Sequence, residues 1–144
     1  MDVLIRQCRQ SDAAAICELN RQEMGYDYPL DSTEQKLERL ISDPSHRIFV
    51  AETAGNVVGY VHAEDYDVLY APHFKNILGI AVAAAYKHSG IGRALLSAVE
   101  AWGTETGAAG IRLVSGAGRI GAHEFYRHCG YNGDKKQINF KKTL

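Results

Sequence analysis

Two glycines separated by one residue, Gly90 and Gly92, lie in the stretch 86–96, which reads YKHSGIGRALL. An apolar run, 77–85, precedes them, and a segment with helical periodicity follows. The first amides of a helix have no partner within it and lie at its positive end, so they bind anions such as a diphosphate. Glycines allow the anion to approach the backbone closely. The turn therefore predicts a phosphate site, and the alternative is a purely steric link between two packed elements.

The usual nucleotide motifs do not fit this turn. A P-loop places Lys and then Ser or Thr directly after its last glycine, whereas Gly92 is followed by Arg93 and Ala94. A dinucleotide fingerprint has a third glycine three residues further on, where this chain has Leu95. Both nucleotide readings fail, so the anion belongs to a different ligand.

Hydrophobic periodicity predicts the elements that position the turn. The expected strands are residues 3–8, 47–52, 57–63, 75–82, 111–115 and 137–144. The expected helices are a segment capped by Ser11, residues 33–42 after a capping box of Ser32 and Gln35, residues 92–106 and residues 120–128. A tight hairpin is expected at Ala54-Gly55-Asn56. The order β-α-α-β-β-β-α-β-α-β predicts one α/β domain over residues 1–144, built on a mixed sheet.

Composition and charge narrow the class of protein. The 144 residues carry a net charge of -1, which gives no basic field for nucleic acid or an anionic membrane. No apolar run approaches the roughly 20 residues needed to span a bilayer. Three cysteines without metal-type spacing fit a reducing compartment. His123 and His128 point about 140° apart on a helix, so no metal is expected. We expect a cytoplasmic protein without nucleic-acid or membrane partners.

Two segments resemble known motifs. Residues 82–96 resemble the acetyl-coenzyme A motif of the GCN5-related N-acetyltransferases (GNAT), a strand followed by Gln/Arg-x-x-Gly-x-Gly/Ala and a helix. Residues 119–131, RIGAHEFYRHCGY, resemble the second signature of that superfamily, Ala-x-x-Phe-Tyr on a helix that ends in Gly-Phe/Tyr. The resemblance covers almost the whole chain. It implies the GNAT-like acyl-CoA N-acyltransferase fold, a central mixed sheet flanked by four helices.

The resemblance implies acetyl-CoA as co-substrate. The backbone amides expected to hold its diphosphate belong to His88, Ser89, Gly90, Ile91, Gly92 and Arg93. The strand from Ile80 to Val82 is expected to pair with the pantetheine arm like an added strand. Three positions depart from the family pattern. Lys87 replaces Gln or Arg, Ala84 replaces a frequent Pro, and Arg119 replaces an Asn that contacts the cofactor arm; we count Lys87 and Arg119 with the cofactor-binding set.

Tyr126 is the expected catalytic acid, because it matches the tyrosine of the second signature. A phenol with a pKa of about 10 suits protonation of the departing CoA thiolate better than a carboxylic acid does. An amide N–H near Val82 is expected to polarise the thioester carbonyl. The alternative for Tyr126 is a core aromatic on an amphipathic helix.

The sequence predicts no single essential base. Asn76 stands where family members often carry a carboxylate, and it cannot take a proton. The nearby alternatives are the carboxylates of Glu64, Asp65 and Asp67 and the imidazoles of His62 and His73. Deprotonating a primary amine of pKa about 10.4 at pH 7 costs about 4.6 kcal/mol, so several groups are expected to share this cost.

The leading functional hypothesis is an N-acetyltransferase acting on a primary amine of a small molecule or peptide. The acidic cluster Glu64, Asp65 and Asp67, together with Asp27 and the loop tyrosines, suggests a cationic acceptor of aminoglycoside or polyamine type. The expected substrate-binding residues are Tyr26, Tyr28, Glu64 and Asp65. The alternative is a non-catalytic acyl-CoA-binding or sensing module of the same fold. Because many relatives pair through their last strands, a homodimer is a further expectation from the resemblance.

Overall fold

The computed structural model describes residues 1–144 and divides them into two compact units, Met1–Leu113 and Val114–Leu144. The single domain expected over the whole chain stays a prediction. No helix is long and apolar enough to cross a membrane.

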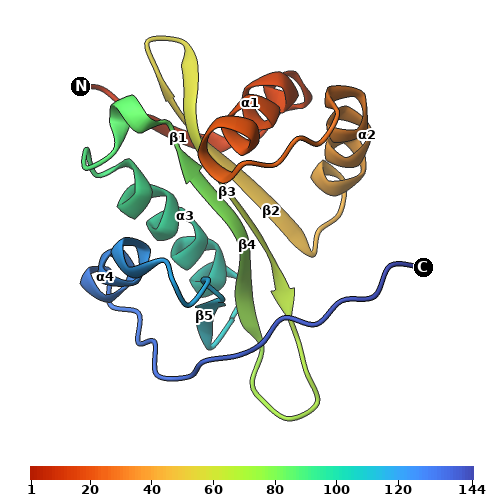
Figure 1. Cartoon of the computed structure of the whole chain (residues 1–144), viewed down its shortest axis with the longest axis vertical. Helices are drawn as coiled ribbons and strands as arrows, with labels where there is room; N and C mark the ends of the chain where they lie inside the picture. The colour runs from red at the N-terminus through yellow and green to blue at the C-terminus, as the bar shows by residue number, and fades with distance from the viewer. The chain divides into compact units, whose positions relative to one another are not determined.

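The first unit is built on a five-stranded mixed sheet in the order β1-β2-β3-β4-β5 (Figure 1). The strands are β1 Leu4–Gln7, β2 His46–Thr53, β3 Asn56–Tyr66, β4 Phe74–Val82 and β5 Gly110–Leu113. Neighbouring strands are antiparallel, except that β4 and β5 are parallel. A parallel pair needs a crossover, which the helix α3, Ile91–Glu105, supplies. The predicted mixed α/β class is confirmed.

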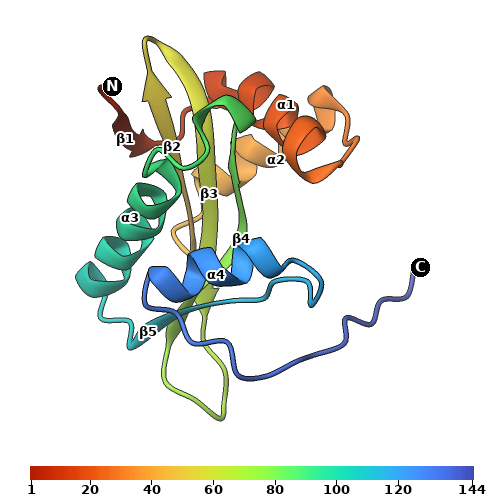
Figure 2. The same cartoon turned by 60° about the vertical axis from the view of Figure 1, so that its left-hand side comes forward.

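Helices cover both faces of this sheet. The helices α1, Ala13–Met24, and α2, Leu30–Ile41, lie on one face, and α3 lies on the other (Figures 1 and 2). On the first face α1 and α2 bury Ile16, Leu19 and Leu37. On the second face α3 buries a stripe with helical spacing: Ile91, Leu95, Leu96, Val99 and Trp102. Each such side chain contributes about 1.5–3 kcal/mol when fully buried, so α3 is held firmly against the sheet.

Alternation along β3 decides which face each polar side chain reaches. Tyr60 points to the α1 face, where its hydroxyl donates to Asn20 Oδ1. Side chains two and four residues further on share this face, so His62 and Glu64 lie there too. Asp65 points to the α3 face, where it pairs with Lys75.

Lys75 is a buried cation that the sequence patterns did not indicate. Only 1% of its side chain is exposed. Its Nζ donates to Asp65 Oδ1 at 2.5 Å and lies 3.6 Å from the centre of the Trp102 ring. His73 contacts the same carboxylate oxygen through Nε2 at 2.7 Å. The burial of this charge is offset by an opposite charge and an aromatic face.

Two predicted helix starts are wrong. The helix α2 begins at Leu30, so the capping box predicted from Ser32 and Gln35 does not form. Pro29 is its N-cap, with φ of -60° and ψ of 146°, and the Pro29 carbonyl accepts the Thr33 hydroxyl at 3.0 Å. The extended backbone that proline favours ends the preceding loop early and lets the helix start there. Similarly, Ser11 lies inside a short 3₁₀ turn, Gln10–Asp12, and does not cap α1.

The other elements follow their predictions closely. The hairpin between β2 and β3 turns at Ala54 and Gly55, whose φ values are +50° and +78°. In the second unit, the helix α4 spans Ile120–His128 as predicted, and Gly130, with φ of +93°, follows its end.

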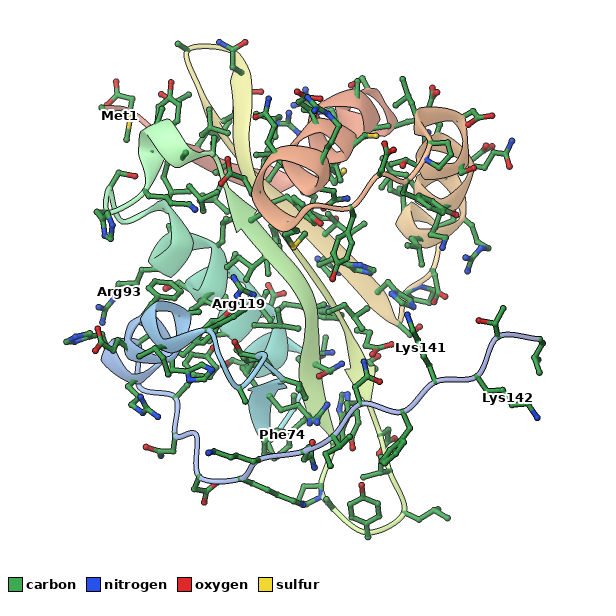
Figure 3. The ribbon with its side chains drawn as sticks, in the orientation of Figure 1. Met1, Phe74, Arg93, Arg119, Lys141 and Lys142 are labelled. Atoms are coloured by element: carbon green, nitrogen blue, oxygen red, sulfur yellow. The ribbon has the colours of Figure 1, made fainter.

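The last predicted strand, residues 137–144, is wrong. Residues 132–144 form neither helix nor strand and take part in no backbone hydrogen bond (Figure 3, where Lys141 and Lys142 are labelled). Ile138 and Phe140 are 78% and 86% exposed. The alternating pattern suits a strand, but a strand also needs a neighbour that pairs with its backbone groups.

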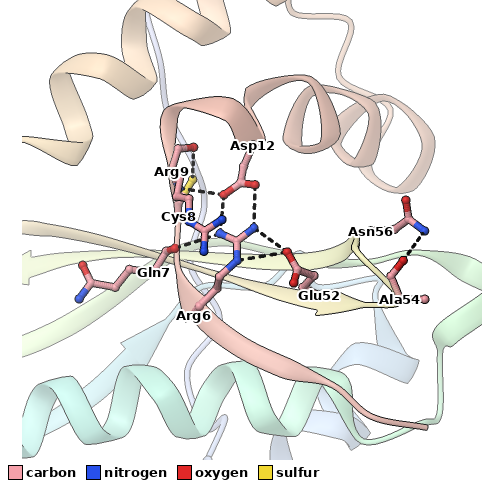
Figure 4. Close-up of polar contacts among 8 residues, drawn as sticks. All are labelled: Arg6, Gln7, Cys8, Arg9, Asp12, Glu52, Ala54 and Asn56. Carbon is pink, nitrogen blue, oxygen red and sulfur yellow. Dashed lines mark hydrogen bonds and ion pairs between the residues drawn. The ribbon is translucent and has the colours of Figure 1, made fainter.

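A buried ion-pair network ties β1 to β2 and to the start of α1 (Figure 4). The Arg6 guanidinium donates to both oxygens of Asp12, at 2.8 and 3.0 Å, and to Glu52 Oε1 at 3.0 Å. The Arg9 amide also donates to Asp12 at 2.8 Å. Burial and the neighbouring Asp12 raise the pKa of Cys8 to about 12, so this cysteine stays a thiol.

Candidate active site

The start of α3 presents a row of unused backbone donors. Its N-cap, Gly90, has φ of +88°, a left-handed conformation that glycine adopts without strain. The first helical hydrogen bond runs from the Ala94 amide to the Gly90 carbonyl. The amides of residues 88–93 donate to no acceptor in the chain. Nothing lies within 4 Å of where a Gly90 Cβ would be, so the space beside the turn is open. These properties fit a diphosphate.

Ordered contacts hold the turn in place. Ile91 is 2% exposed and anchors the helix start in the core, while Arg93 is exposed (Figure 3). The Ser89 hydroxyl donates to the Tyr86 carbonyl, so its side chain stabilises the loop itself. His88 has φ of +62°, which is rare for a residue with a side chain. Contacts within the chain thus fix the conformation of this loop.

Glu23 links α1 to this loop. Its Oε2 accepts the Ala84 amide at 3.1 Å, a bond that a proline at position 84 has no N–H to make. Its Oε1 lies 3.2 Å from Lys87 Nζ. The predicted phosphate donor Lys87 is therefore paired with a carboxylate, and Ala84 gains a contact in exchange for the rigidity of proline.

Half of β4 has an open edge. The strand β5 pairs with β4 only from Phe74 to Ile77. From Gly79 to Val82, β4 pairs with β3 alone. The register shifts by one residue between His62 and Ala63, which leaves Leu78 as the extra residue of a bulge. The backbone groups of residues 78–82 that face away from β3 have no strand partner, so an extended ligand can pair there.

A row of polar side chains crosses the sheet just before β4 and β5 separate. Arg112 Nη1 donates to Asn76 Oδ1 at 2.6 Å, and Asn76 Nδ2 donates to Glu64 Oε2 at 3.0 Å. The Arg112 guanidinium also lies 4.1 Å from the centre of the Tyr66 ring. Sequence reasoning singled out Glu64 and Asn76 but missed Arg112. The register that places Arg112 opposite Asn76 depends on the length of the crossover, which no local pattern specifies.

The two histidines named as alternative bases, His62 and His73, each contact another titratable side chain. His62 Nε2 lies 2.9 Å from His46 Nδ1. Burial, with a smaller effect of His46, lowers the pKa of His62 to about 4. At neutral pH His62 is therefore uncharged and a weaker base than a histidine with the ordinary pKa of 6.5. His73 and Asp65 both lie with Lys75 on the α3 face, away from Glu64.

The tyrosines of the loop after α1 border an open depression of about 450 Å³. Its lining residues are Asn20, Tyr26, Asp27, Tyr28 and Lys36. Tyr26 and Tyr28 are 62% and 47% exposed, and Lys36 Nζ lies 5.0 Å from the Tyr28 ring centre. The depression is on the α1 face of the sheet, which is also the face of Glu64.

Tyr126 belongs to the second unit, on α4. Its ring lies 5.3 Å from that of Phe125 and 6.3 Å from that of Tyr131. Burial raises the pKa of Tyr126 above its ordinary value of 10.0, despite the opposing charge of Arg119. The phenol is therefore fully protonated at neutral pH, as a proton donor must be.

The comparisons with known proteins assign the family. The model of the acetyltransferase (GNAT) family matches residues 13–131. The chain belongs to the GNAT family. The GNAT match spans both sequence motifs and confirms the resemblance on which acetyl-CoA was predicted. This GNAT protein is an acetyl-CoA-dependent N-acetyltransferase, and the sensing-module alternative is set aside.

Relatives of this GNAT enzyme include aminoglycoside N-acetyltransferases. It is 28% identical over 145 residues to aminoglycoside N(6')-acetyltransferase type 1 of Stenotrophomonas maltophilia. The alignment covers 97% of this chain and 93% of that protein. Its fold matches AAC(6')-Iy in complex with the bisubstrate analogue CoA-S-monomethyl-acetylneamine, with a TM-score of 0.88 and 19% identity over 100% of both chains. AAC(6')-Ih from Acinetobacter baumannii matches with a TM-score of 0.86 and 18% identity over 99% of both chains. The solved structures confirm the fold.

Replacing Gly90 by Val is expected to weaken acetyl-CoA binding. A β-branched side chain at φ of +88° strains the turn and crowds the open space beside the amides. Gly107→Val is the matched control, because Gly107 has φ of +78°, no neighbour within 4 Å, and lies past the other end of α3. Both variants are expected to lower the melting temperature. Only Gly90→Val is expected to raise the calorimetric Kd for acetyl-CoA, and equal Kd values for the two would contradict a cradle at this turn.

Proposed function

We propose that this enzyme transfers the acetyl group of acetyl-CoA to a primary amine of a small cationic molecule of aminoglycoside type. The observation that carries the proposal is the set of polar and aromatic side chains on the α1 face of the sheet. There an open depression is lined by Asn20, Tyr26, Asp27, Tyr28 and Lys36. On the same face lies the Glu64 carboxylate, and Glu23 of α1 contacts the loop that precedes α3. The near full-length similarity to an aminoglycoside N(6')-acetyltransferase supports the same acceptor class.

In this proposal the donor is held by backbone groups. The amides of His88, Ser89, Gly90, Ile91, Gly92 and Arg93 bind the diphosphate, with Lys87 and Arg119 as flanking cations. Residues Ile80 to Val82 pair with the pantetheine arm along the open edge of β4. The thioester then lies toward the bulge at Leu78. We therefore place the backbone N–H that polarises its carbonyl there, and no longer near Val82, where it was expected from the sequence.

The reaction proceeds by direct attack. The neutral amine nitrogen forms a bond to the thioester carbon, the C–S bond breaks, and the CoA sulfur leaves as a thiolate. Tyr126 donates its phenolic proton to that sulfur and is reprotonated by solvent. The acceptor binds as an ammonium ion and loses one proton to water or a nearby carboxylate before the attack; the nitrogen loses a second proton to solvent after it. No single residue is an essential base, since Asn76 cannot accept a proton.

The substrate class is tested by comparing acceptors. The release of CoA thiol from acetyl-CoA is measured with a 6'-amino aminoglycoside, a linear polyamine and a peptide with a free N-terminus, each over a range of concentrations. The proposal predicts the highest kcat/KM for the aminoglycoside. A higher kcat/KM for the peptide would contradict the proposed acceptor class while leaving the enzyme an N-acetyltransferase.

A further inference from the structure

We propose that Arg112 and Asn76 orient Glu64 so that its second carboxylate oxygen binds the reacting ammonium group of the acceptor. The inference rests on the proposed function and adds the position of the reacting amine. It assigns Glu64 as the contact to substrate, and Asn76 and Arg112 as positioning residues.

The direction of the hydrogen bonds in this row is fixed by chemistry. A guanidinium only donates, so the Asn76 atom 2.6 Å from Arg112 Nη1 must be its carbonyl oxygen. The Asn76 amide nitrogen must then face Glu64, to which it donates at 3.0 Å. Arg112 thus sets the orientation of the Asn76 amide, and Asn76 in turn sets that of the Glu64 carboxylate.

An amide is the side chain that suits this position. It accepts from a cation on one strand and donates to a carboxylate on the other, which an aspartate cannot do. An aspartate at position 76 would pair with Arg112 and repel Glu64. With Asn76 in the middle of the row, its negative charge lies on β3, at Glu64.

The second oxygen of Glu64 is available to a ligand. Oε2 accepts from Asn76, whereas Oε1 has no partner in the chain and is not enclosed. His62, the neighbouring polar residue on this face of β3, is bonded to His46 and stays neutral. The carboxylate oxygen is thus the free anionic acceptor in this row, which suits an ammonium group.

The row also lies at the correct end of the open edge. Asn76 pairs with Arg112, and one residue later Ile77 and Leu113 form the last pair between β4 and β5. The bulge at Leu78 follows at once. In the proposed function the pantetheine arm runs along β4 from Val82 toward Leu78, so an amine at Glu64 Oε1 would lie near the thioester.

The test compares binding of two ligands that differ in one group. Protein saturated with CoA is titrated calorimetrically with a 6'-amino aminoglycoside and with its 6'-hydroxy counterpart. A hydroxyl carries no charge, so wild type is expected to prefer the amine by about 10- to 100-fold. Glu64→Gln is expected to remove this preference while the Kd for CoA and the melting temperature stay unchanged.

Two further variants separate positioning from general structure. Glu105→Gln makes the same chemical change at the exposed C-terminal end of α3 and is expected to keep the wild-type preference. Asn76→Leu breaks both hydrogen bonds and is expected to reduce the preference. Combined with Glu64→Gln it should add no further loss, because Asn76 acts through Glu64. In turnover, both Glu64→Gln and Asn76→Leu should raise the KM for the amine more than they lower kcat.

The outcomes distinguish this inference from the proposed function. A wild-type preference that survives Glu64→Gln overturns the role of Glu64 and leaves the proposed acceptor class intact. An additive loss in the double variant overturns the positioning role of Asn76. If CoA-saturated wild type binds neither aminoglycoside, the proposed acceptor class fails and this inference fails with it.

Discussion

Tyr126→Phe is expected to lower kcat by about 100-fold or more, with the Kd for acetyl-CoA unchanged, because general acid catalysis contributes about 10²–10⁴-fold. The change removes only the hydroxyl and keeps the aromatic contacts with Phe125 and Tyr131. The raised pKa of Tyr126 also fixes the pH profile. A donor must be protonated, so kcat of the wild type should show no decrease from this group until the pH exceeds about 10.

Tyr131→Phe is the control for this variant. It makes the same chemical change in the same unit, one ring away, and its kcat is expected to stay near that of the wild type. Stopped-flow measurement of thiol release gives kcat, and calorimetry gives the Kd for acetyl-CoA. A Tyr126→Phe variant as fast as Tyr131→Phe would make Tyr126 a core aromatic residue and would remove it from the mechanism.

Arg6→Met is expected to destabilise the fold by about 3–5 kcal/mol, because removing one partner of a buried ion pair leaves the other charge uncompensated. The side chains of Arg6 and Asp12 are only 12% and 7% exposed, and their pairing is bidentate. Arg21→Met is the control, since Arg21 and Glu18 form a pair on the exposed surface of α1. Urea unfolding should show a much lower midpoint for Arg6→Met and little change for Arg21→Met.

The same pair predicts how stability depends on pH. Burial raises the pKa of Asp12, but the hydrogen bonds from Arg6 and the Arg9 amide outweigh it, so the pKa is lowered overall. A lowered pKa gives stability that is present above the unfolded value of 3.8 and is lost as pH falls through the folded value. In Arg6→Met the carboxylate keeps its burial without the cation, so protonation relieves it. The stability gap between wild type and Arg6→Met should therefore shrink as pH falls from 7 toward 4, and a constant gap would contradict this account.

The elements that form the donor site were predictable because their signals are local. The glycine turn, the amphipathic α3 and the hairpin at Ala54 each depend on a few adjacent residues. The start of α2 was missed because Pro29 outweighed a capping box that the sequence allows. The last strand was missed because an alternating pattern does not specify a pairing partner.

The side-chain contacts on the proposed acceptor side of the sheet were harder to predict, because they depend on pairings between residues that are distant in the sequence. The alternation of β3 already implies that Glu64 and Asp65 face opposite ways, and this signal could have separated them. By contrast, the contacts of Asp65 with the buried Lys75 and of Asn76 with Arg112 need the register of three strands. A bulge at Leu78 shifts that register by one residue, which no count along the sequence reveals.

The central claim is the transfer of an acetyl group from acetyl-CoA to the amine of a small cationic molecule. It is tested most directly with acetyl-CoA labelled at the carbonyl carbon, incubated with the protein and a 6'-amino aminoglycoside and analysed by mass spectrometry. The account predicts one labelled acetyl group on the aminoglycoside for each CoA thiol released. Labelled acetyl-CoA that binds the protein but stays intact, or thiol release without a labelled aminoglycoside, would contradict it.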